Sequence, residues 1–254
     1  MGIFKRKRKV DARKNRIVIA ENTTRVGSKG YTRLKDNILY LNADGKCKVI
    51  QIESSLAHEC KTTVAANLAV SLGYTEKKVI VIDLDFRRPR AHRVFGLEKE
   101  KGIAEYVLGA LSEKDIVKKT EYKNVDLITR GAEIFNPSLI FVSDRFKKLM
   151  DYARENYDYV ILDCAPVLQV SDYIHISKIS DGVLFLVAYG ITTKNVVQDA
   201  IASLRKNNVN ILGTVFTMYN KKNTREYKKY YKYYNYEDSY YIDTEEDEAV
   251  TENE

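Results

Sequence analysis

The chain has 254 residues, of which 44% are hydrophobic, and its formal net charge is +7. A chain of this length can bury a full core within one α/β domain, and no apolar run approaches the roughly 18 residues of a membrane-spanning helix. Three cysteines are too few for a disulfide framework and no signal peptide is visible, so we expect a cytoplasmic protein.

The excess positive charge lies in the first residues. Residues 1–16 hold eight Lys or Arg against one Asp, whereas the rest of the chain is balanced. We expect residues 1–28 to be a basic, disordered arm. Residues 3–16, which include Ile3 and Phe4, could lie on an anionic membrane surface, and a solvated tail is the alternative. Nucleic-acid binding is not expected, because no reading helix or interleaved aromatic residue accompanies the charges.

The apolar patterns predict alternating helices and strands. A helix over 31–41, with Leu34, Ile38 and Leu41 at helical spacing, should precede a strand that begins at Val49. Further helices are expected around 64–73, 103–108, 112–119, 139–155, 171–179 and 193–207. Further strands are expected over 79–84, 125–129, 159–163, 182–188 and 211–218.

This alternation predicts an α/β fold with a mostly parallel sheet and helices on both faces. The folded domain should cover residues 29–219. Ligands of such sheets bind beyond the carboxyl ends of the strands, so the residues that follow the strands are the candidates for function.

One such segment resembles a phosphate-binding P-loop. An apolar strand, a tight loop, a Lys followed by a hydroxyl residue and an apolar helix are the parts of that motif. The candidate nucleotide-binding residues are Ala57, His58, Glu59, Cys60, Lys61, Thr62 and Thr63. The usual glycines are missing, however, and a Lys-Thr pair at the start of a helix can simply cap that helix.

Three acidic residues stand at the ends of predicted strands. Asp83 and Asp85 are two residues apart and should point to one side, and Asp163 closes the strand YVILD. Together with the Lys-Thr loop they could supply Mg²⁺ ligands and a catalytic base. The alternative is that they cap helices.

These motifs resemble those of the cytoplasmic bacterial tyrosine kinases of capsule and exopolysaccharide synthesis. The resemblance covers about 31–241 and is carried by KTTVAANLAVSL, by VIVIDLDFRRPRAHRVFGL and by YDYVILDCAPVL; AEIFNPS and ILGTVFT occupy further family positions. The family belongs to the deviant-Walker P-loop ATPases, with the Min and Par proteins. It implies ATP and Mg²⁺ as cofactors, phosphorylation of tail tyrosines of a neighbouring subunit, a homo-oligomeric ring and a separate transmembrane activator at the inner face of the cell membrane.

The resemblance also implies roles for single residues. Lys61 neutralises phosphate charge, the Thr62 hydroxyl binds Mg²⁺, and Asp85 and Asp163 hold that ion directly or through waters. Asp83 is the candidate to accept the proton of the attacking tyrosine. Arg87 and Arg88 either contact the transition state or a phosphotyrosine, or are surface charges that flank a turn.

The chain departs from the family pattern in three places. Ala57-His58-Glu59-Cys60-Lys61 replaces Pro-Gly-x-Gly-Lys, and if the two glycine conformations are kept, each non-glycine residue costs about 1 to 3 kcal/mol. That cost would weaken ATP binding. Lys29, Thr32 and Lys35 replace the Glu, Arg and Arg of the ring contacts, whereas the Asn is kept as Asn37. Thr217 replaces an Asn near the adenine.

Residues 220–254 should form a disordered tail. Eight tyrosines are the candidate autophosphorylation sites: Tyr227, Tyr230, Tyr231, Tyr233, Tyr234, Tyr236, Tyr240 and Tyr241. The segment 237–254 then holds nine acids and no base.

Three functions are consistent with this pattern. The first is an ATP-dependent protein-tyrosine autokinase that regulates capsular or exopolysaccharide synthesis. The second is a catalytically weak or inactive relative that acts as a scaffold in polysaccharide export. A positioning ATPase of the Min or Par kind is the third, and neither the tyrosine-rich tail nor Arg87-Arg88-Pro89 serves that purpose.

Overall fold

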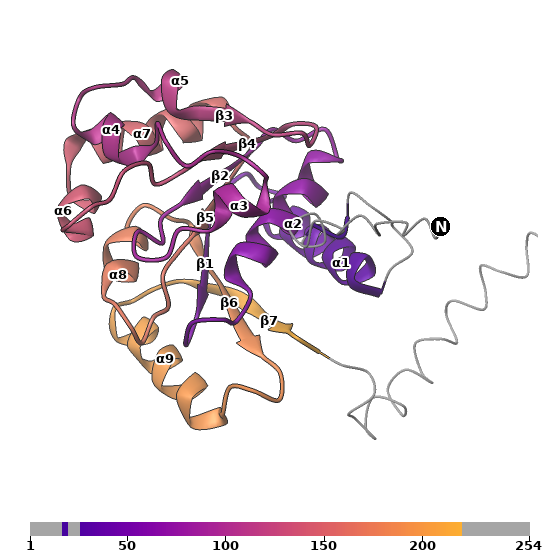
Figure 1. Cartoon of the computed structure of the whole chain (residues 1–254). Coiled ribbons are helices and arrows are strands. Elements are labelled where there is room, and N and C mark those ends of the chain that lie inside the picture. The colour runs from indigo at the N-terminus through magenta and orange to yellow at the C-terminus, as the bar shows by residue number, and fades with distance from the viewer. Residues whose placement is uncertain (1–16, 20–25, 220–254) are drawn as a thin grey trace, which may run out of the picture. The chain divides into compact units, whose positions relative to one another are not determined.

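A computed structural model describes residues 17–19 and 26–219. Its described part contains a seven-stranded sheet with the order β3-β4-β2-β5-β1-β6-β7 (Figure 1). The strands are β1 (Val49–Ser54), β2 (Val79–Asp83), β3 (Val117–Lys119), β4 (Val125–Ile128), β5 (Tyr159–Asp163), β6 (Gly182–Ala188) and β7 (Ile211–Thr217). All neighbouring pairs are parallel except β3 and β4, which are antiparallel. The predicted mostly parallel sheet is confirmed.

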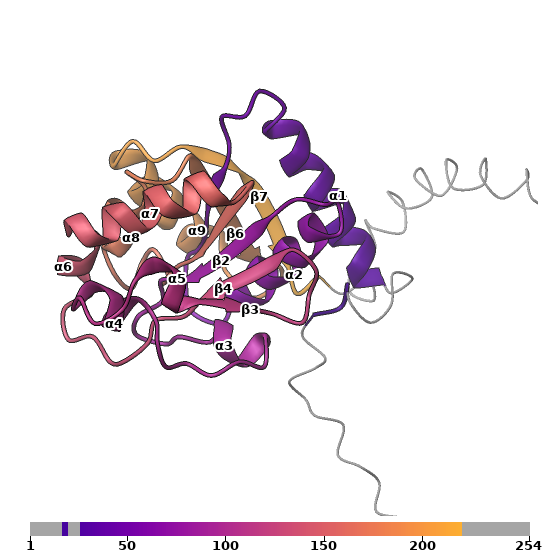
Figure 2. The same cartoon turned by 90° about the horizontal axis from the view of Figure 1, so that it is seen from above.

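Helices cover both faces of this sheet. They are α1 (Val26–Leu41), α2 (Lys61–Gly73), α3 (Ala91–Val94), α4 (Ile103–Val107), α5 (Glu113–Ile116), α6 (Pro137–Phe141), α7 (Asp144–Asn156), α8 (Asp172–Ile176) and α9 (Lys194–Lys206). The cores show that α1, α2 and α3 pack on one face, and α4 to α9 on the other. Figure 1 has α1 and α2 to the right of the sheet, and in Figure 2 the strands again lie between α1 and α7.

The central strands β1, β2, β5 and β6 are buried along their whole length, because helices cover them on both sides. This explains their near-continuous apolar sequences. Helix α2 is also buried almost all round, since α1 covers the side that does not face the sheet. The loop between β1 and α2 is therefore held between two rigid elements.

Three predicted helices differ from expectation. The helix expected over 171–179 is reduced to α8, Asp172–Ile176. The segment 112–119 forms α5, but Val117–Lys119 turns into the edge strand β3, which pairs with β4. The expected helix over 139–155 is broken into α6 and α7, because the Ser143 hydroxyl accepts a hydrogen bond from the Phe146 N–H and starts a new helix. Leu41, predicted on an apolar face, is 43% exposed.

The predicted boundary of the basic arm was too late in the chain. Ile17 and Ile19 are buried in the core, and the Val18 N–H donates to Asn67 Oδ1 at 2.9 Å. Helix α1 begins at Val26, within the predicted arm. The predicted membrane-binding residues 3–16 and the tyrosine-rich tail lie outside the described residues. Within the described residues, no helix has the length and apolarity to cross a bilayer.

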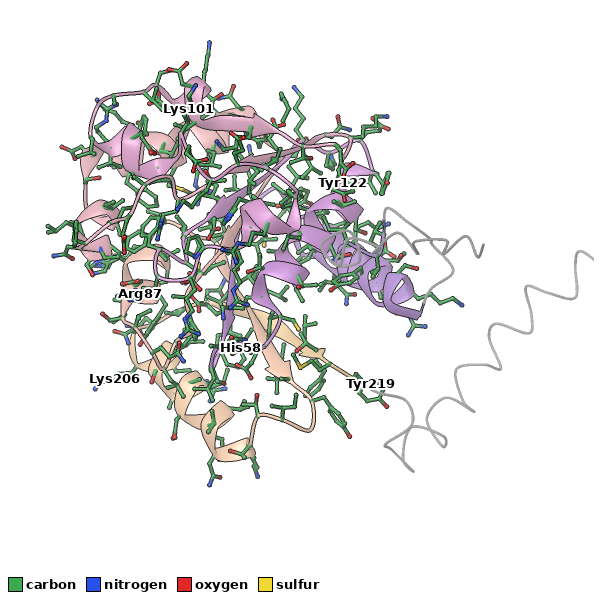
Figure 3. All side chains as sticks on the ribbon, viewed as in Figure 1. His58, Arg87, Lys101, Tyr122, Lys206 and Tyr219 are labelled. Carbon is green, nitrogen blue, oxygen red and sulfur yellow. The ribbon has the colours of Figure 1, made fainter. Side chains whose placement is uncertain are left out.

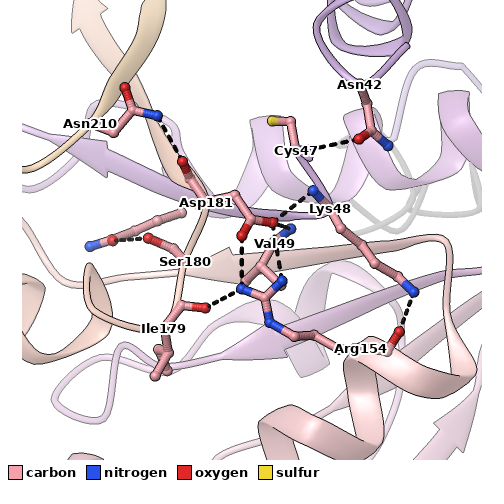
Figure 4. Close-up of polar contacts among 10 residues, drawn as sticks. Asn42, Cys47, Lys48, Val49, Arg154, Ile179, Ser180, Asp181 and Asn210 are labelled. Carbon is pink, nitrogen blue, oxygen red and sulfur yellow. Dashed lines mark hydrogen bonds and ion pairs between the residues drawn. The ribbon is translucent and has the colours of Figure 1, made fainter. Parts of the chain in front are cut away.

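An ionic network closes the amino end of the sheet (Figure 4). The Asp181 carboxylate accepts hydrogen bonds from the N–H groups of Lys48 and Val49, at 2.7 and 2.6 Å, and pairs with the Arg154 guanidinium at 2.8 Å. Arg154 also donates to the Ile179 carbonyl, and Lys48 Nζ donates to the Arg154 carbonyl. These contacts fasten α7 and the start of β6 to the start of β1, at the end of the sheet away from the β1–α2 loop.

Candidate active site

The loop between β1 and α2 lies at the carboxyl ends of the parallel strands, where ligands of such sheets bind. His58 marks it in Figure 3. The loop leads into the first turn of α2, whose backbone N–H groups have no intrahelical partner and can hold an anion. The sequence prediction of a phosphate-binding position is consistent with this geometry.

The loop keeps the two glycine-like conformations without the glycines. His58 has φ 68° and Cys60 has φ 69°, both in the left-handed region. This region is costly for residues that carry a Cβ atom. The non-glycine residues His58 and Cys60 thus keep the two glycine conformations, so backbone strain is expected at both positions.

The buried side chain of Glu59 holds the loop in place through hydrogen bonds. Its side chain is 2% exposed and accepts hydrogen bonds from the Leu56 N–H at 2.6 Å, from the Ala188 N–H at 3.4 Å and from the Thr192 hydroxyl. The sequence pattern places Glu59 in the loop but gives no sign of this anchoring, because two of its three partners, Ala188 and Thr192, lie at and beyond the end of β6. Because the Glu59 side chain is buried and hydrogen-bonded within the protein, only the backbone of Glu59 is available to bind a phosphate.

The buried ammonium group of Lys61 is positioned to bind an anion. Its side chain is buried, and Nζ donates to Ser54 Oγ at 3.1 Å. The Ser54 hydroxyl in turn donates to the Leu56 carbonyl at 2.8 Å. The ammonium group is thus held at the base of the loop by neutral partners.

The predicted carboxylates are brought together at the strand ends. Asp83 and Asp163 are register partners on β2 and β5 and are almost completely buried. Asp83 Oδ2 accepts from the Ala91 N–H at 3.0 Å, whereas Asp83 Oδ1 and both carboxylate oxygens of Asp163 have no hydrogen-bond partner. Unpartnered buried oxygens are unusual and indicate a ligand site.

The surroundings of these groups favour their protonated forms. Burial, and then the charges of Asp163 and Asp85, raise the pKa of Asp83 well above its ordinary value. Burial raises the pKa of Asp163 to about 7, and the nearby Thr62 hydroxyl and Lys61 act in the opposite direction. Thr62 is close enough to affect Asp163 but its geometry falls short of a hydrogen bond. A cation between these groups would relieve this repulsion.

The donor set fits Mg²⁺ bound together with phosphate. Thr62, Asp85 and Asp163 offer oxygen atoms, as Mg²⁺ prefers, and the ion usually keeps several waters and phosphate oxygens among its ligands. Among the described residues, no group of three or more His, Cys, Asp or Glu could hold a metal alone. The residues therefore suit an ion that arrives with a nucleotide.

A further buried carboxyl group next to the site was not among the predicted residues. Glu53 precedes the loop on β1, is fully buried and accepts a hydrogen bond from Gln51 Nε2 at 2.7 Å. Burial raises the pKa of Glu53 to about 8, although Gln51 and Lys61 oppose this. The position of Glu53 inside an otherwise apolar strand was the sequence signal that could have identified it.

The two arginines that follow Asp85 have different surroundings. Arg87 forms an ion pair with the buried Asp172 at the start of α8. The Arg88 N–H donates to Asp85 Oδ1 at 2.9 Å, which closes the turn before Pro89. Arg87 is thus partly structural, while the side chain of Arg88 is exposed.

The remaining departures from the family also have places in the structure. The Thr217 hydroxyl donates to the Glu59 carbonyl at 3.2 Å and links the end of β7 to the loop. The four ring-contact positions, three of them replaced, lie on α1, where Lys29, Thr32 and Asn37 are exposed and Lys35 is half-buried beside Asp36.

Comparisons with known proteins agree with this site. A family profile described as "AAA domain" matches residues 47–214. The tyrosine-protein kinase YwqD of Bacillus subtilis (strain 168) is 32% identical over 205 residues, which cover 80% of this chain and 86% of that protein. The tyrosine-protein kinase etk of Escherichia coli (strain K12) is 29% identical over 72% of this chain, but that region is 25% of the etk protein.

Solved structures, among them a bacterial tyrosine kinase domain, are also similar to this chain. The chimerical protein CapA2B2 has a TM-score of 0.78 and 28% identity, over 81% of this chain and 91% of that one. The kinase domain of Escherichia coli ETK also has a TM-score of 0.78, with 26% identity over 82% of each chain. MinD of Pyrococcus horikoshii OT3, at 22% identity and a TM-score of 0.58, is alike in fold alone.

The profile match covers the β1–α2 loop and all three carboxylates, and the kinase relatives match over most of this chain. The expected resemblance and the P-loop fold are thereby confirmed. The chain belongs to the bacterial tyrosine-protein kinases, a family of P-loop transferases.

Proposed function

We propose that this chain is an ATP-dependent protein-tyrosine autokinase that modifies the tail tyrosines of neighbouring subunits and regulates capsular or exopolysaccharide synthesis. The observation that carries the proposal is the buried Lys61 beside the unpartnered oxygens of Asp83 and Asp163. Phosphoryl transfer depends mainly on positioning and on neutralising charge, and this arrangement supplies both.

Each residue has a stated role. Lys61 and the N–H groups of the loop neutralise the phosphates, while Thr62, Asp85 and Asp163 hold Mg²⁺, which supplies charge neutralisation when bound. Asp83 in its ionised form accepts the proton of the attacking tyrosine hydroxyl, and bound Mg²⁺ would favour that form by offsetting the negative charges of Asp163 and Asp85, which otherwise raise the pKa of Asp83. Glu59 holds the loop in place.

The tyrosine substrate comes from a second copy. Eight tyrosines between Tyr227 and Tyr241 are the acceptors, and the chain works in a homo-oligomer recruited by a transmembrane activator at the inner face of the membrane. The basic residues 3–16 strengthen that membrane position by electrostatic attraction.

The test is phosphotyrosine detection in the purified full chain with ATP and Mg²⁺, beside a Lys61→Met control. Labelling of the wild type and its loss in Lys61→Met support the proposal. No labelling of the wild type, with or without the soluble part of a cognate activator, contradicts it.

One observation favours a second function. His58 and Cys60 hold left-handed conformations in the loop, with Cβ atoms where related loops have none. If these atoms obstruct the phosphates, the chain is a catalytically weak scaffold in polysaccharide export. Nucleotide binding without labelling in the same assay would identify it.

A further inference from the structure

A basic cavity of about 660 Å³ lies beside the candidate active site. It follows Asp85 in the chain, and Arg87 marks its position in Figure 3. Its lining includes six permanently cationic side chains, Arg87, Arg88, Arg90, Arg93, Lys99 and Arg130, against two acids, Glu98 and Glu100. This volume suits one bulky side chain or a small molecule.

The positive charge of this pocket is not neutralised within the described residues. Arg87 is the lining cation that has a carboxylate partner, Asp172. Arg88, Arg90, Arg93 and Lys99 form no ion pair with a described residue. An uncompensated cluster of this kind attracts a multiply charged anion, and guanidinium groups bind phosphate through paired hydrogen bonds.

Part of the pocket is fixed in place before any ligand arrives. Arg130 is buried, and its Nη1 donates to the Phe86 carbonyl at 2.8 Å. His92 contributes a buried Nδ1 that has no hydrogen-bond partner. Burial and the charges of Arg93 and Lys99 lower the pKa of His92, so it faces the pocket as a neutral group.

We propose that this basic pocket binds a phosphotyrosine of the segment 227–241, supplied by a second copy of the chain. The proposal rests on the proposed function, which places phosphate on these tyrosines. It assigns a place for the reaction product that is distinct from the nucleotide loop, so that a phosphorylated tail stays attached to the neighbouring subunit.

The tail is the favoured occupant for two reasons. First, the pocket begins at the turn where the Arg88 N–H contacts Asp85, so the product is formed next to it. Second, the end of the tail, residues 237–254, carries nine acids, which add attraction to a basic surface. A membrane or a nucleic acid would need an extended basic surface, whereas this site is concave and carries the exposed acids Glu98 and Glu100.

The experiment measures binding of a fluorescent synthetic peptide of residues 227–241 to the dephosphorylated full chain by anisotropy, at roughly physiological salt. One peptide carries phosphotyrosine at position 234 and its match carries Tyr234. We expect the phosphorylated peptide to bind at least tenfold more tightly. Arg90→Gln with Arg93→Gln should remove at least tenfold of that affinity and leave ATP affinity unchanged. Arg205→Gln, an exposed arginine on α9, is the matched control.

Other outcomes overturn the proposal. Equal binding of the two peptides, or equal loss in the Arg205→Gln control, would show attraction by charge alone. Phenyl phosphate and inorganic phosphate are tested as competitors, and if they bind the pocket while the phosphopeptide does not, the site belongs to a small molecule. Preferential binding to vesicles with anionic lipid, lost in the Arg90 and Arg93 double variant, would assign it to a membrane.

The proposal can fail independently of the kinase function. The peptide is phosphorylated by synthesis, so the measurement needs no enzyme activity, and Lys61→Met chain should bind it as the wild type does. Loss of labelling in the activity assay with retained peptide binding would contradict the kinase alone. Normal labelling without peptide binding would contradict the pocket alone.

Discussion

His58 and Cys60 stand on either side of Glu59 and share one backbone conformation, with φ angles of 68° and 69°. Between them the Glu59 side chain is buried and bonded to the Leu56 N–H and the Thr192 hydroxyl. The anchored residue prevents the loop from relaxing around its two strained neighbours. The fold therefore keeps the shape of a phosphate-binding loop although the sequence lacks the residues that adopt this shape without strain.

Replacing both residues by glycine should increase nucleotide binding and labelling. His58→Gly with Cys60→Gly removes the Cβ atoms that oppose an inward-facing cradle of N–H groups. ATP affinity and tail labelling should rise by tenfold or more if the relief reaches about 1.4 kcal/mol. Titration with a fluorescent ATP analogue and phosphotyrosine detection measure the two effects.

The matched control for this variant is Asn208→Gly. Asn208 also has a positive φ, of 54°, but lies after α9, outside the loop. It should leave ATP affinity unchanged. Addition of Asp83→Asn to the glycine pair should abolish the gain in labelling. Unchanged affinity in the glycine pair would show that the loop is not the limiting defect, and would turn attention to Thr217 and α1.

Much of the fold was predictable because apolar runs and their lengths determine which segments become buried strands. The bounds of β5 and β6 were predicted as they stand. The failures were local. Edge strand β3 forms because the outer edge of β4 has no other partner among the described strands, and the pattern of residues 112–119 does not indicate this pairing. The break between α6 and α7 depends on the hydroxyl of Ser143, which caps the start of α7.

The site residues that belong to a local sequence motif could be predicted. Lys61, Asp83 and Asp163 were each placed by a strand end, and the structure brings them together. The anchoring of Glu59 was not predictable, because it depends on Thr192, which is distant in sequence. The burial of Glu53 had a signal in the sequence, its position inside the apolar strand β1, but its hydrogen bond from Gln51 did not.

Asp181 should be important for stability and not for nucleotide binding. Asp181→Ala leaves the N–H groups of Lys48 and Val49 without their acceptor and removes the ion-pair partner of the Arg154 guanidinium. The free energy of unfolding should fall by about 2 kcal/mol or more, measured by urea denaturation.

The exposed pair of Lys123 and Glu76 provides the comparison for Asp181. Lys123→Ala should lower the free energy of unfolding much less than Asp181→Ala does, because solvent screens that pair. ATP affinity should be unchanged in both variants at a temperature where they stay folded. Equal destabilisation by the two variants would contradict the importance of the network around Asp181.

Glu53 should make the folded chain less stable as the pH rises. Its pKa is raised from 4.5 to about 8, so the folded state holds this proton more tightly than the unfolded state. Its stabilising contribution is fully present below pH 4.5 and is lost as the pH rises to about 8. The slope from this group is at most about 1.4 kcal/mol per pH unit.

Glu53→Gln keeps the shape of the protonated side chain and removes its titration. Urea denaturation between pH 5 and 8.5 should give a shallower decline of the free energy of unfolding than in the wild type. The decline should not vanish, because Asp163 shifts in the same direction. Glu121→Gln, on an exposed turn, should follow the wild-type curve. Identical slopes for Glu53→Gln and the wild type would contradict the prediction.

The tail should carry nearly all of the phosphate, and no single tyrosine should be essential. Eight tyrosines lie within 227–241, so each Tyr→Phe change, such as Tyr234→Phe, should lower labelling only partly. Deletion of 227–241 should abolish nearly all of it, while deletion of the acidic residues 242–254 should leave labelling in place. Phosphotyrosine blots and mass spectrometry of tryptic peptides measure both effects. Labelling that persists after deletion of 227–241 would mean that tyrosines of the folded domain are the acceptors.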